Sequence, residues 1–208
     1  MKNLGPYEIN NIYAGECSEM MKALPDGCID LTVTSPPYDN LREYKGYVFD
    51  YKPVIEQLYR ITKPGGVVVW VVADATINGS ETGTSFKQAL YGMSVGFNLH
   101  QTIIYEKDGL PFPPQNKYYS IFEYSFVFSK GKPVSVNLIE EKNKWAGSKS
   151  KPTYRQVDGS KNGGTRKIIN ETRPKTNIWR YKVGHSKTTL DKYAFVHPAM
   201  YPEALARD

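Results

Sequence analysis

This 208-residue chain lacks long hydrophobic runs, metal-ligand cysteine spacings and a phosphate-binding glycine loop. The longest apolar run, Val67 to Ala73, is far too short to cross a bilayer, and the amino terminus has no apolar segment of the signal-peptide kind. Cys17 and Cys28 have no histidine partners, so we expect both to be reduced and buried, with no metal site. Gly163-Gly164 is not followed by the Lys-Ser/Thr of a P-loop. These absences favour a protein of the cytosol.

The chain does contain an apolar strand that stops at two consecutive prolines. Residues 29–34 are Ile-Asp-Leu-Thr-Val-Thr, and Ser35-Pro36-Pro37-Tyr38 follows directly. Because proline cannot donate to a sheet, the strand is expected to end at Ser35. A rigid loop then lies at the carboxyl end of a strand, where open α/β sheets bind their ligands. A plain Pro-Pro turn is the alternative interpretation.

Ser35-Pro36-Pro37-Tyr38 resembles the Ser/Asp/Asn-Pro-Pro-Tyr/Phe/Trp motif of the DNA methyltransferases that methylate exocyclic amines, in their circularly permuted β-class. The resemblance implies that Ser35, Pro36, Pro37 and Tyr38 are catalytic. The Ser35 hydroxyl and the Pro36 carbonyl would accept the two amine hydrogens, and Tyr38 would stack on a base that has left the duplex. No strong base is needed, since alignment of amine and methyl donor supplies most of the rate.

The same resemblance implies S-adenosylmethionine as the methyl donor. Gly15-Glu16 stands where the family usually has a Gly-Asp turn beside the adenine, and the segment from His197 resembles the one that packs beside the cofactor. The residues expected to bind the cofactor are Glu16, Thr34, Ser35, His197 and Pro198.

Apolar periodicity predicts alternating strands and helices. Strands are expected at residues 11–15, 29–34, 67–72, 98–106 and 123–129, and helices at 18–24 and 203–207. Two further helices are expected, one with Asp50 as its N-cap that ends before Pro64, and one with Ser85 as its N-cap that ends before Gly96. The run at 67–72 is apolar on both faces, as a central parallel strand should be. In the helix after Asp50, Val54, Leu58 and Ile61 form a stripe that we expect to face the sheet, and Phe86, Ala89, Leu90 and Met93 form one stripe of the helix after Ser85.

Together with the resemblance, these elements predict an α/β fold. We expect an incomplete Rossmann-like class I methyltransferase sheet, mostly parallel with an antiparallel edge pair, and an irregular basic target-recognition region. Asp74 is expected at the catalytic edge of the sheet. Tyr118 or Phe122 is expected to wall the base pocket, although packing is the commoner role of aromatic residues on edge strands.

Positive charge is concentrated in residues 142–192, where fourteen lysines and arginines face three acids, a net charge of +11 that leaves −5 for the rest. A basic arm on an acidic body is typical of a polyanion-binding protein, and a solvated surface insert is the alternative. The resemblance implies double-stranded DNA as the partner. The residues predicted to bind nucleic acid are Lys144, Lys149, Lys151, Arg155, Arg166, Lys167, Arg173, Lys175 and Arg180.

Three regions are expected: a catalytic portion at 1–135, a target-recognition region at 136–192 and a cofactor-flanking segment at 193–208. The family's glycine-rich cofactor loop normally follows that segment, but the chain contains no Gly-x-Gly. We therefore expect a gap in the sheet between the strands at 11–15 and 29–34. A complementing carboxyl-terminal polypeptide, or self-association, would fill it.

The predicted function is site-specific transfer of a methyl group from S-adenosylmethionine to a flipped base, in a cytoplasmic, prokaryotic or phage-encoded restriction-modification setting without a membrane. Cytosine N4 is favoured because Ser in the first motif position is more usual for cytosine. Adenine N6 is one alternative, and a non-catalytic DNA-binding fragment that needs a second polypeptide is another. Methylation of RNA or of protein glutamine shares the Pro-Pro-Tyr chemistry, but the basic region argues for nucleic acid.

Overall fold

The structure is a computed structural model that describes residues 3–39, 48–111, 113, 116–184, 187–197, 200 and 202–208. The chain forms two compact units, one of Met1–Ser135 with Asn177–Asp208 and one of Val136–Thr176. The second unit begins where the sequence predicts a new region. It ends earlier than the predicted residue 192, because β15 (Ile178–Tyr181) joins the sheet of the first unit.

That sheet has five strands in the described part of the chain, in the order β15-β7-β8-β4-β3. Its strands are β3 (Ile29–Thr34), β4 (Thr62–Val72), β7 (Asn98–Lys107), β8 (Phe122–Ser129) and β15. The outer pairs β3–β4 and β15–β7 are parallel, and the inner pairs β4–β8 and β7–β8 are antiparallel. The α/β class is confirmed, but β4 is parallel to only one neighbour and the antiparallel pairs lie inside the sheet.

Four α-helices are described: α1 (Cys17–Lys22), α2 (Tyr51–Ile61), α3 (Thr84–Val95) and α4 (Glu203–Arg207), with a 3-10 turn η1 at Tyr193–Val196. Each begins or ends within a few residues of the predicted position. Asp50 caps α2 as predicted, with its carboxylate accepting from the Lys52 N–H at 3.0 Å. None of the helices in the described residues is long and apolar enough to cross a membrane.

The predicted strand at residues 11–15 is wrong. Asn10 has a φ of +64°, and the Ile12 side chain is 95% exposed, so this segment pairs with no strand among the described residues. The nearby strands are instead a small hairpin of β1 (Asn3–Leu4) and β2 (Tyr7–Glu8). A second small hairpin joins β5 (Thr76–Ile77) to β6 (Ser80–Glu81). Consequently β3 is the outer strand of the described sheet.

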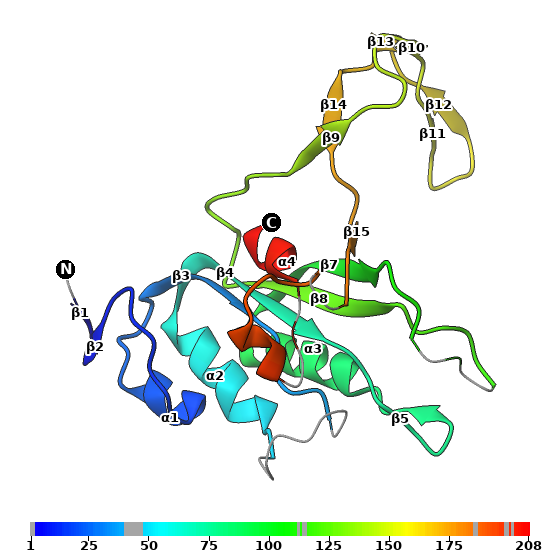
Figure 1. Cartoon of the computed structure of the whole chain (residues 1–208). Coiled ribbons are helices and arrows are strands. Elements are labelled where there is room, and N and C mark those ends of the chain that lie inside the picture. Colours follow the sequence, from blue (N-terminus) through cyan, green and yellow to red (C-terminus); the bar gives the residue numbers. More distant parts are fainter. Residues whose placement is uncertain are drawn as a thin grey trace. The chain divides into compact units, whose positions relative to one another are not determined.

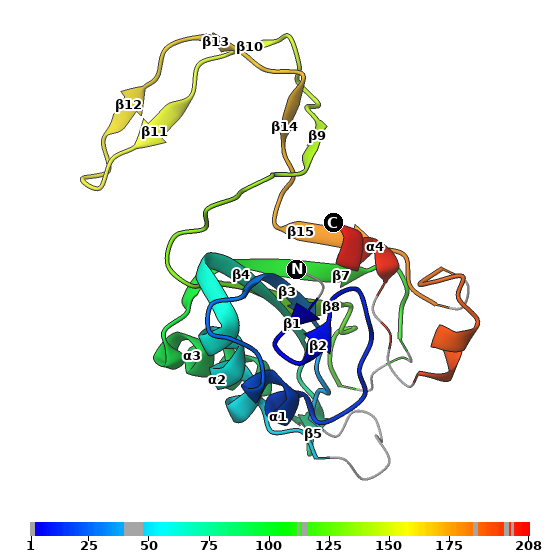
Figure 2. The ribbon, with the colours of Figure 1, turned by 90° about the vertical axis from the view of Figure 1, so that its left-hand side faces the viewer.

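The sheet has an apolar core on each face. On one face Val68 and Trp70 of β4 pack with Ile55 and Leu58 of α2. On the other, Val71 packs with residues of β7 and β15 and with Leu205 of α4. Figures 1 and 2 show α2 and α3 on one face of the sheet and α4 on the opposite face. Burial on both faces explains the uninterrupted apolar run of β4.

Only part of the apolar stripe of α3 faces the sheet. Ala89 is buried, but Phe86, Leu90 and Met93 are 49%, 65% and 47% exposed. The buried residues of α3 are Ser85, Gln88, Ala89 and Gly92. A β-carbon at Gly92 would come within 3.0 Å of the Phe128 ring, so α3 approaches the sheet through its small side chains. This close approach directs the larger apolar side chains outward.

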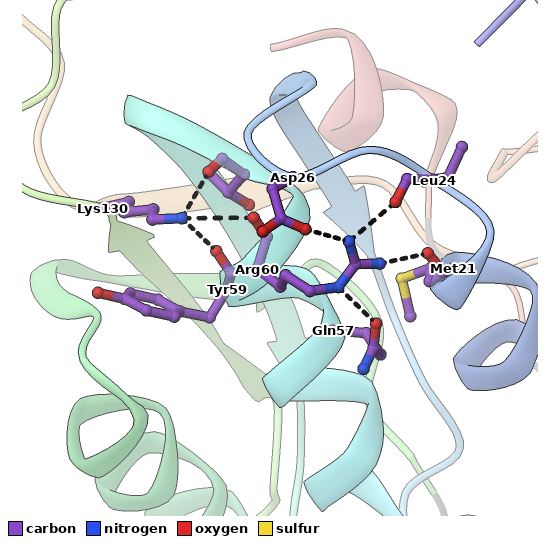
Figure 3. A network of polar contacts seen from close by, with 8 residues as sticks. Met21, Leu24, Asp26, Gln57, Tyr59, Arg60 and Lys130 are labelled. Atoms are coloured by element: carbon purple, nitrogen blue, oxygen red, sulfur yellow. Dashed lines mark hydrogen bonds and ion pairs between the residues drawn. The ribbon is translucent and has the colours of Figure 1, made fainter. Parts of the chain in front are cut away.

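Two cations hold the end of α2 against its neighbours, as Figure 3 shows. Arg60 donates to the carbonyls of Met21 and Leu24, at 2.6 and 2.8 Å, and pairs with Asp26. The Lys130 ammonium donates to the Tyr59 and Thr62 carbonyls at 2.8 and 3.0 Å. These bonds satisfy orphan carbonyls at helix ends and join α2 to α1 and to the residue that follows β8.

The second unit is an antiparallel ribbon rather than an irregular region. Three short strand pairs follow one another along it: β9 (Glu140–Lys142) with β14 (Thr172–Pro174), β10 (Lys149–Ser150) with β13 (Lys167–Ile168), and β11 (Thr153–Arg155) with β12 (Lys161–Gly163). The pairs share no regular apolar alternation because most of their side chains are exposed. The sequence pattern therefore did not indicate them.

The cysteines are free, as expected, but Cys17 is exposed at the start of α1 and Cys28 is half-buried. The prediction that both are buried is wrong for Cys17. Desolvation of the sulfur by surrounding protein atoms, and after it the neighbouring Glu16 carboxylate, raises the pKa of the Cys17 thiol. This thiol is therefore not activated.

A buried hydrogen bond joins α3 to the sheet, and its loss should destabilise the fold. The Trp70 indole N–H donates to the Gln88 side-chain oxygen at 2.7 Å, and both residues are 1% exposed. Replacing Gln88 with Leu leaves the indole N–H without its acceptor, so we expect a loss of about 1–3 kcal/mol in the free energy of unfolding. Urea unfolding followed by tryptophan fluorescence measures it. Gln101→Leu, at an exposed position of β7, is the control, and equal losses in both variants would contradict the prediction.

Candidate active site

The Pro-Pro loop lies where β3 and β4 both end. β3 finishes at Thr34, which pairs in parallel register with Trp70, and Ser35 to Tyr38 follow outside any regular element. Parallel strands place their carboxyl ends at one edge of the sheet, so this loop lies at the ligand-binding edge predicted from the sequence. Pro36 is buried, while Ser35, Pro37 and Tyr38 are half-buried.

Asp39 holds the end of this loop. It adopts a φ of +44°, and its carboxylate accepts from the Thr82 hydroxyl at 2.6 Å and from the Ala75 N–H at 3.1 Å. Although burial opposes it, hydrogen bonding from Thr82, Thr84 and Ala75 keeps the pKa of Asp39 below its ordinary value. The carboxylate form is therefore the one that ties the loop to the segment before α3.

Asp74 lies at the same edge but serves mainly α3. Its carboxylate accepts from the Ser85 N–H at 2.9 Å and from the Ser85 hydroxyl, near the first turn of the helix. A further contact of 3.2 Å reaches the Thr82 hydroxyl, which also binds Asp39. Asp74 thus supports the loop indirectly, through a shared threonine.

The loop side chains form a hydrogen-bond chain that reaches across the sheet to β8. The Tyr38 hydroxyl donates to the Glu123 carboxylate at 2.8 Å and lies 2.5 Å from the Ser35 hydroxyl. The second Glu123 oxygen pairs with the Lys107 ammonium at 2.5 Å. Burial, and then the charge of Glu123, raises the pKa of Tyr38 far above its ordinary value, so the phenol keeps its proton at neutral pH.

A large hollow of about 630 Å³ opens beside these hydrogen-bonded side chains. Its walls include Ser35, Tyr38 and Glu123 together with the aromatic rings of Phe122 and Tyr124. Phe122 therefore takes the position predicted for a pocket wall. Tyr118 does not, because it is 96% exposed and lies outside the lining.

Two further hollows meet the loop from other sides. The β3 hollow, about 530 Å³, lies between Glu16, Phe49 and the segment Thr34–Pro37. The His197 hollow, about 370 Å³, lies between Thr34, Ser35 and the segment around η1. Ser35 lines all three hollows. This residue is therefore accessible both from the large hollow and from the two smaller ones.

Most residues predicted to bind the cofactor line the two smaller hollows. Glu16 caps α1, accepting from the Ser18 N–H at 3.0 Å, and faces the β3 hollow. Thr34 and Ser35 line both hollows, and His197 lines the second. Pro198 lies outside the described residues.

Eight of the nine predicted nucleic-acid contacts lie in the ribbon of the second unit, and Arg180 lies in β15 of the first unit. Arg173 is ion-paired with Glu141 at 2.5 Å, and Arg180 is ion-paired with Glu106 at 3.4 Å. The Lys144 ammonium lies 5.4 Å from the Trp145 ring centre. Along the ribbon, Lys149, Arg155 and Lys167 are exposed.

Sequence reasoning missed Glu123, Lys107 and Asp39. Glu123 and Lys107 come from different strands, and their meeting depends on the pairing of β7 with β8. One signal was available, because Glu123 is the single acid in an otherwise aromatic and small strand, Phe122–Ser129. Among the described residues, no group of three His, Cys, Asp or Glu side chains could hold a metal ion.

Comparison with known proteins places these features in a family. The DNA methylase family of N6 and N4 methyltransferases matches residues 29–208, which is most of the chain. This chain belongs to the N6/N4 DNA methylase family. The orphan methyltransferase M.BamHII of Bacillus amyloliquefaciens is 55% identical over 193 residues, covering 91% of this chain and 73% of M.BamHII. S-adenosylmethionine is the methyl donor of the family.

Two other DNA methyltransferases resemble this chain, one in sequence and one in fold. The type II beta methyltransferase M.BslI of Bacillus sp. strain NEB-606 is 28% identical over 166 residues, covering 62% of this methylase and 18% of M.BslI. The solved PvuII cytosine-N4-specific DNA methyltransferase has a TM-score of 0.60 at 16% identity, covering 93% of this chain and 66% of that one, which shows a shared fold. This methylase thus spans only part of each relative.

The residues around the two smaller hollows fit S-adenosylmethionine. The β3 hollow offers an aromatic ring from Phe49 and the carboxylate of Glu16, as a nucleoside requires. The His197 hollow has Asp191 and Glu203 in its wall, which suit a ligand with a sulfonium and an ammonium group. Both hollows reach Ser35, the first residue of the Pro-Pro loop.

Proposed function

We propose that this methylase transfers a methyl group from S-adenosylmethionine to the N4 amine of a cytosine that has left the DNA duplex. The observation that supports this most strongly is the position of Ser35, between the large hollow and the two smaller hollows. An amine in the large hollow and a methyl donor in the smaller ones would meet at this residue. The choice of cytosine depends on Ser in the first motif position.

The loop would hold the amine by accepting both of its hydrogens. Ser35 offers its hydroxyl oxygen, and Pro36 offers a carbonyl with no N–H of its own beside it. Two acceptors favour the pyramidal amine, whose lone pair is available for bonding. Pro37 keeps the loop rigid, and the Tyr38 ring, tied at its hydroxyl to Glu123, supplies a fixed wall for the base.

When bound, S-adenosylmethionine supplies a methyl group on a positively charged sulfur. We propose that Glu16 and Thr34 hold its nucleoside part, that His197, with Pro198 beside it, flanks its other end, and that Ser35 lies where the two meet. The nitrogen–carbon bond would form as the carbon–sulfur bond breaks, the neutral thioether would leave, and the amine proton would pass to solvent water. The protein's contribution is alignment, which reaches ~7–11 kcal/mol in favourable intramolecular reactions.

The second unit is proposed to be the target-recognition region. A two-stranded antiparallel ribbon fits the major groove of DNA, and this one carries Lys149 and Lys167 close together on paired strands. The proposed phosphate contacts are Lys144, Lys149, Lys151, Arg155, Arg166, Lys167, Arg173 and Lys175, with Arg180 at the sheet edge. The order of catalytic loop, ribbon and cofactor-flanking segment is that of the β-class.

We also propose that a further polypeptide segment pairs with the outer edge of β3. In the described chain β3 has a strand on one side only, and Leu31 of this strand is 58% exposed. An unpaired apolar edge readily accepts another strand. Both smaller hollows include the end of β3 in their lining, so added strands would also enclose the cofactor.

Loss of the Ser35 hydroxyl should abolish methyl transfer and spare DNA binding. We expect Ser35→Ala to lower kcat at saturating S-adenosylmethionine by roughly 100-fold or more, as when one transition-state hydrogen bond is removed. Transfer of labelled methyl groups to duplex DNA, followed by digestion to nucleosides, measures both rate and product. N4-methylcytosine is expected, and methyladenine would overturn the cytosine assignment.

Ser94→Ala is the matched control, because this exposed serine donates only to the nearby Tyr91 carbonyl. Tyr38→Ala should also abolish transfer. Equal losses of methyl transfer and DNA affinity in the loop variants would contradict a catalytic role for the loop. DNA binding by the unsubstituted chain without any transfer would indicate a non-catalytic DNA-binding protein.

Neutralising ribbon cations should weaken DNA binding in a salt-dependent manner. For Lys149→Gln and Lys167→Gln we expect the slope of log affinity against log salt to fall by about 0.9 for each phosphate that the protein no longer neutralises. Fluorescence anisotropy of a labelled duplex at several salt concentrations measures it. Lys22→Gln, on exposed α1 of the first unit, should leave the slope unchanged, and an effect as large as that of the ribbon variants would remove the support for the ribbon.

The open edge of β3 predicts weak cofactor binding by this chain alone. Calorimetric titration with S-adenosylmethionine should give a dissociation constant well above micromolar, and micromolar binding would refute the proposed segment. Analytical sedimentation then distinguishes whether the added segment comes from a second copy of this chain or from a separate polypeptide. Self-association that Leu31→Lys abolishes would identify a second copy as the occupant, whereas a monomer with weak binding supports a separate segment.

A further inference from the structure

A mostly buried carboxylate ends the hydrogen-bond chain that begins at Ser35, the proposed catalytic serine. Glu123 has a side chain only 11% exposed, and each of its oxygens has a partner. One oxygen accepts from the Tyr38 hydroxyl at 2.8 Å, and the other pairs with Lys107 at 2.5 Å. The Ser35 hydroxyl lies 2.5 Å from that of Tyr38.

The hydrogen bonds from Ser35 through Tyr38 to Glu123 can run in only one direction. A carboxylate has no hydrogen to donate, so the single hydroxyl hydrogen of Tyr38 is committed to Glu123. The contact between Tyr38 and Ser35 then needs the hydrogen of Ser35. Since that hydrogen points to Tyr38, the Ser35 oxygen presents only lone pairs to the large hollow.

We propose that Glu123 is a positioning residue that makes Ser35 an obligate hydrogen-bond acceptor, so that the pocket selects an amine over a carbonyl. This inference depends on the proposed function. A cytosine or adenine directs N–H groups at Ser35, which it can accept. Thymine, uracil or guanine would direct a carbonyl oxygen at the same lone pairs, and Ser35 would have no hydrogen left to donate.

Lys107 makes the charge of Glu123 essential to this direction. In a Glu123→Gln variant the ammonium of Lys107, which can only donate, would bind the amide oxygen. The amide NH₂ group would then face Tyr38 and donate to it. Tyr38 would in turn donate to Ser35, and the Ser35 hydrogen would point into the hollow, where it repels an amine hydrogen. The nearly isosteric substitution therefore reverses the direction of the hydrogen bonds between these three residues.

The rate of methyl transfer tests this reversal. For Glu123→Gln we expect kcat at saturating S-adenosylmethionine to fall by about 100-fold, with the KM for DNA changed by less than about threefold. In the double variant Lys107→Met with Glu123→Gln, the amide oxygen is free to turn to Tyr38. We expect it to recover at least about tenfold of the lost kcat. A merely structural role of Glu123 predicts no such recovery.

Base selection gives a second measurement that does not need turnover by the variant. Duplexes with cytosine or uracil at the position found methylated are compared by anisotropy. The unsubstituted protein should prefer cytosine by about tenfold, and Glu123→Gln should lose or invert this preference. Glu19→Gln on exposed α1 is the control and should retain it, and circular dichroism should show all variants folded.

The outcomes separate this inference from the proposed function. Full activity in Glu123→Gln, or an unchanged preference for cytosine, overturns the role of Glu123 while Ser35→Ala remains inactive. Activity in Ser35→Ala removes the proposed function itself. A double variant as inactive as Glu123→Gln shows that Glu123 acts through packing, which also overturns the inference.

Discussion

The contact between the Tyr38 hydroxyl and the Glu123 carboxylate is the interaction on which the organisation of the site depends. It joins the loop after β3 to the start of β8, so the wall of the large hollow is fixed from two sides. Because the carboxylate is mostly buried and paired with Lys107, its lone pairs can be satisfied only by donors. The protonation and direction of the whole chain follow from that restriction.

The mixed topology of the sheet makes this contact available. β3 and β4 are parallel and end at one edge, whereas β8 is antiparallel to β4 and therefore begins at that edge. Tyr124 is paired with Val72, the last residue of β4, which places Glu123 just beyond the strand end. A wholly parallel sheet would have placed the start of this strand, and its acid, at the opposite edge.

The surroundings of the loop show how rigidity and access are combined. Cores on both faces fix β4, and Asp39 fastens the far end of the loop, so the loop has little freedom. Ser35 nevertheless lines three hollows, which leaves it reachable from more than one side.

Local chemistry in the sequence determined where the strand before Ser35 ends, where α2 begins and which region carries the positive charge. Paired prolines, a capping Asp50 and clustered lysines act within a few residues, so they can be interpreted without a fold. Only the tertiary structure decided that α3 packs through Gly92, that the basic region is a ribbon, and that Glu123 reaches Tyr38. Each of these depends on which strands become neighbours, and that is decided by the burial of both faces of the sheet over the whole chain.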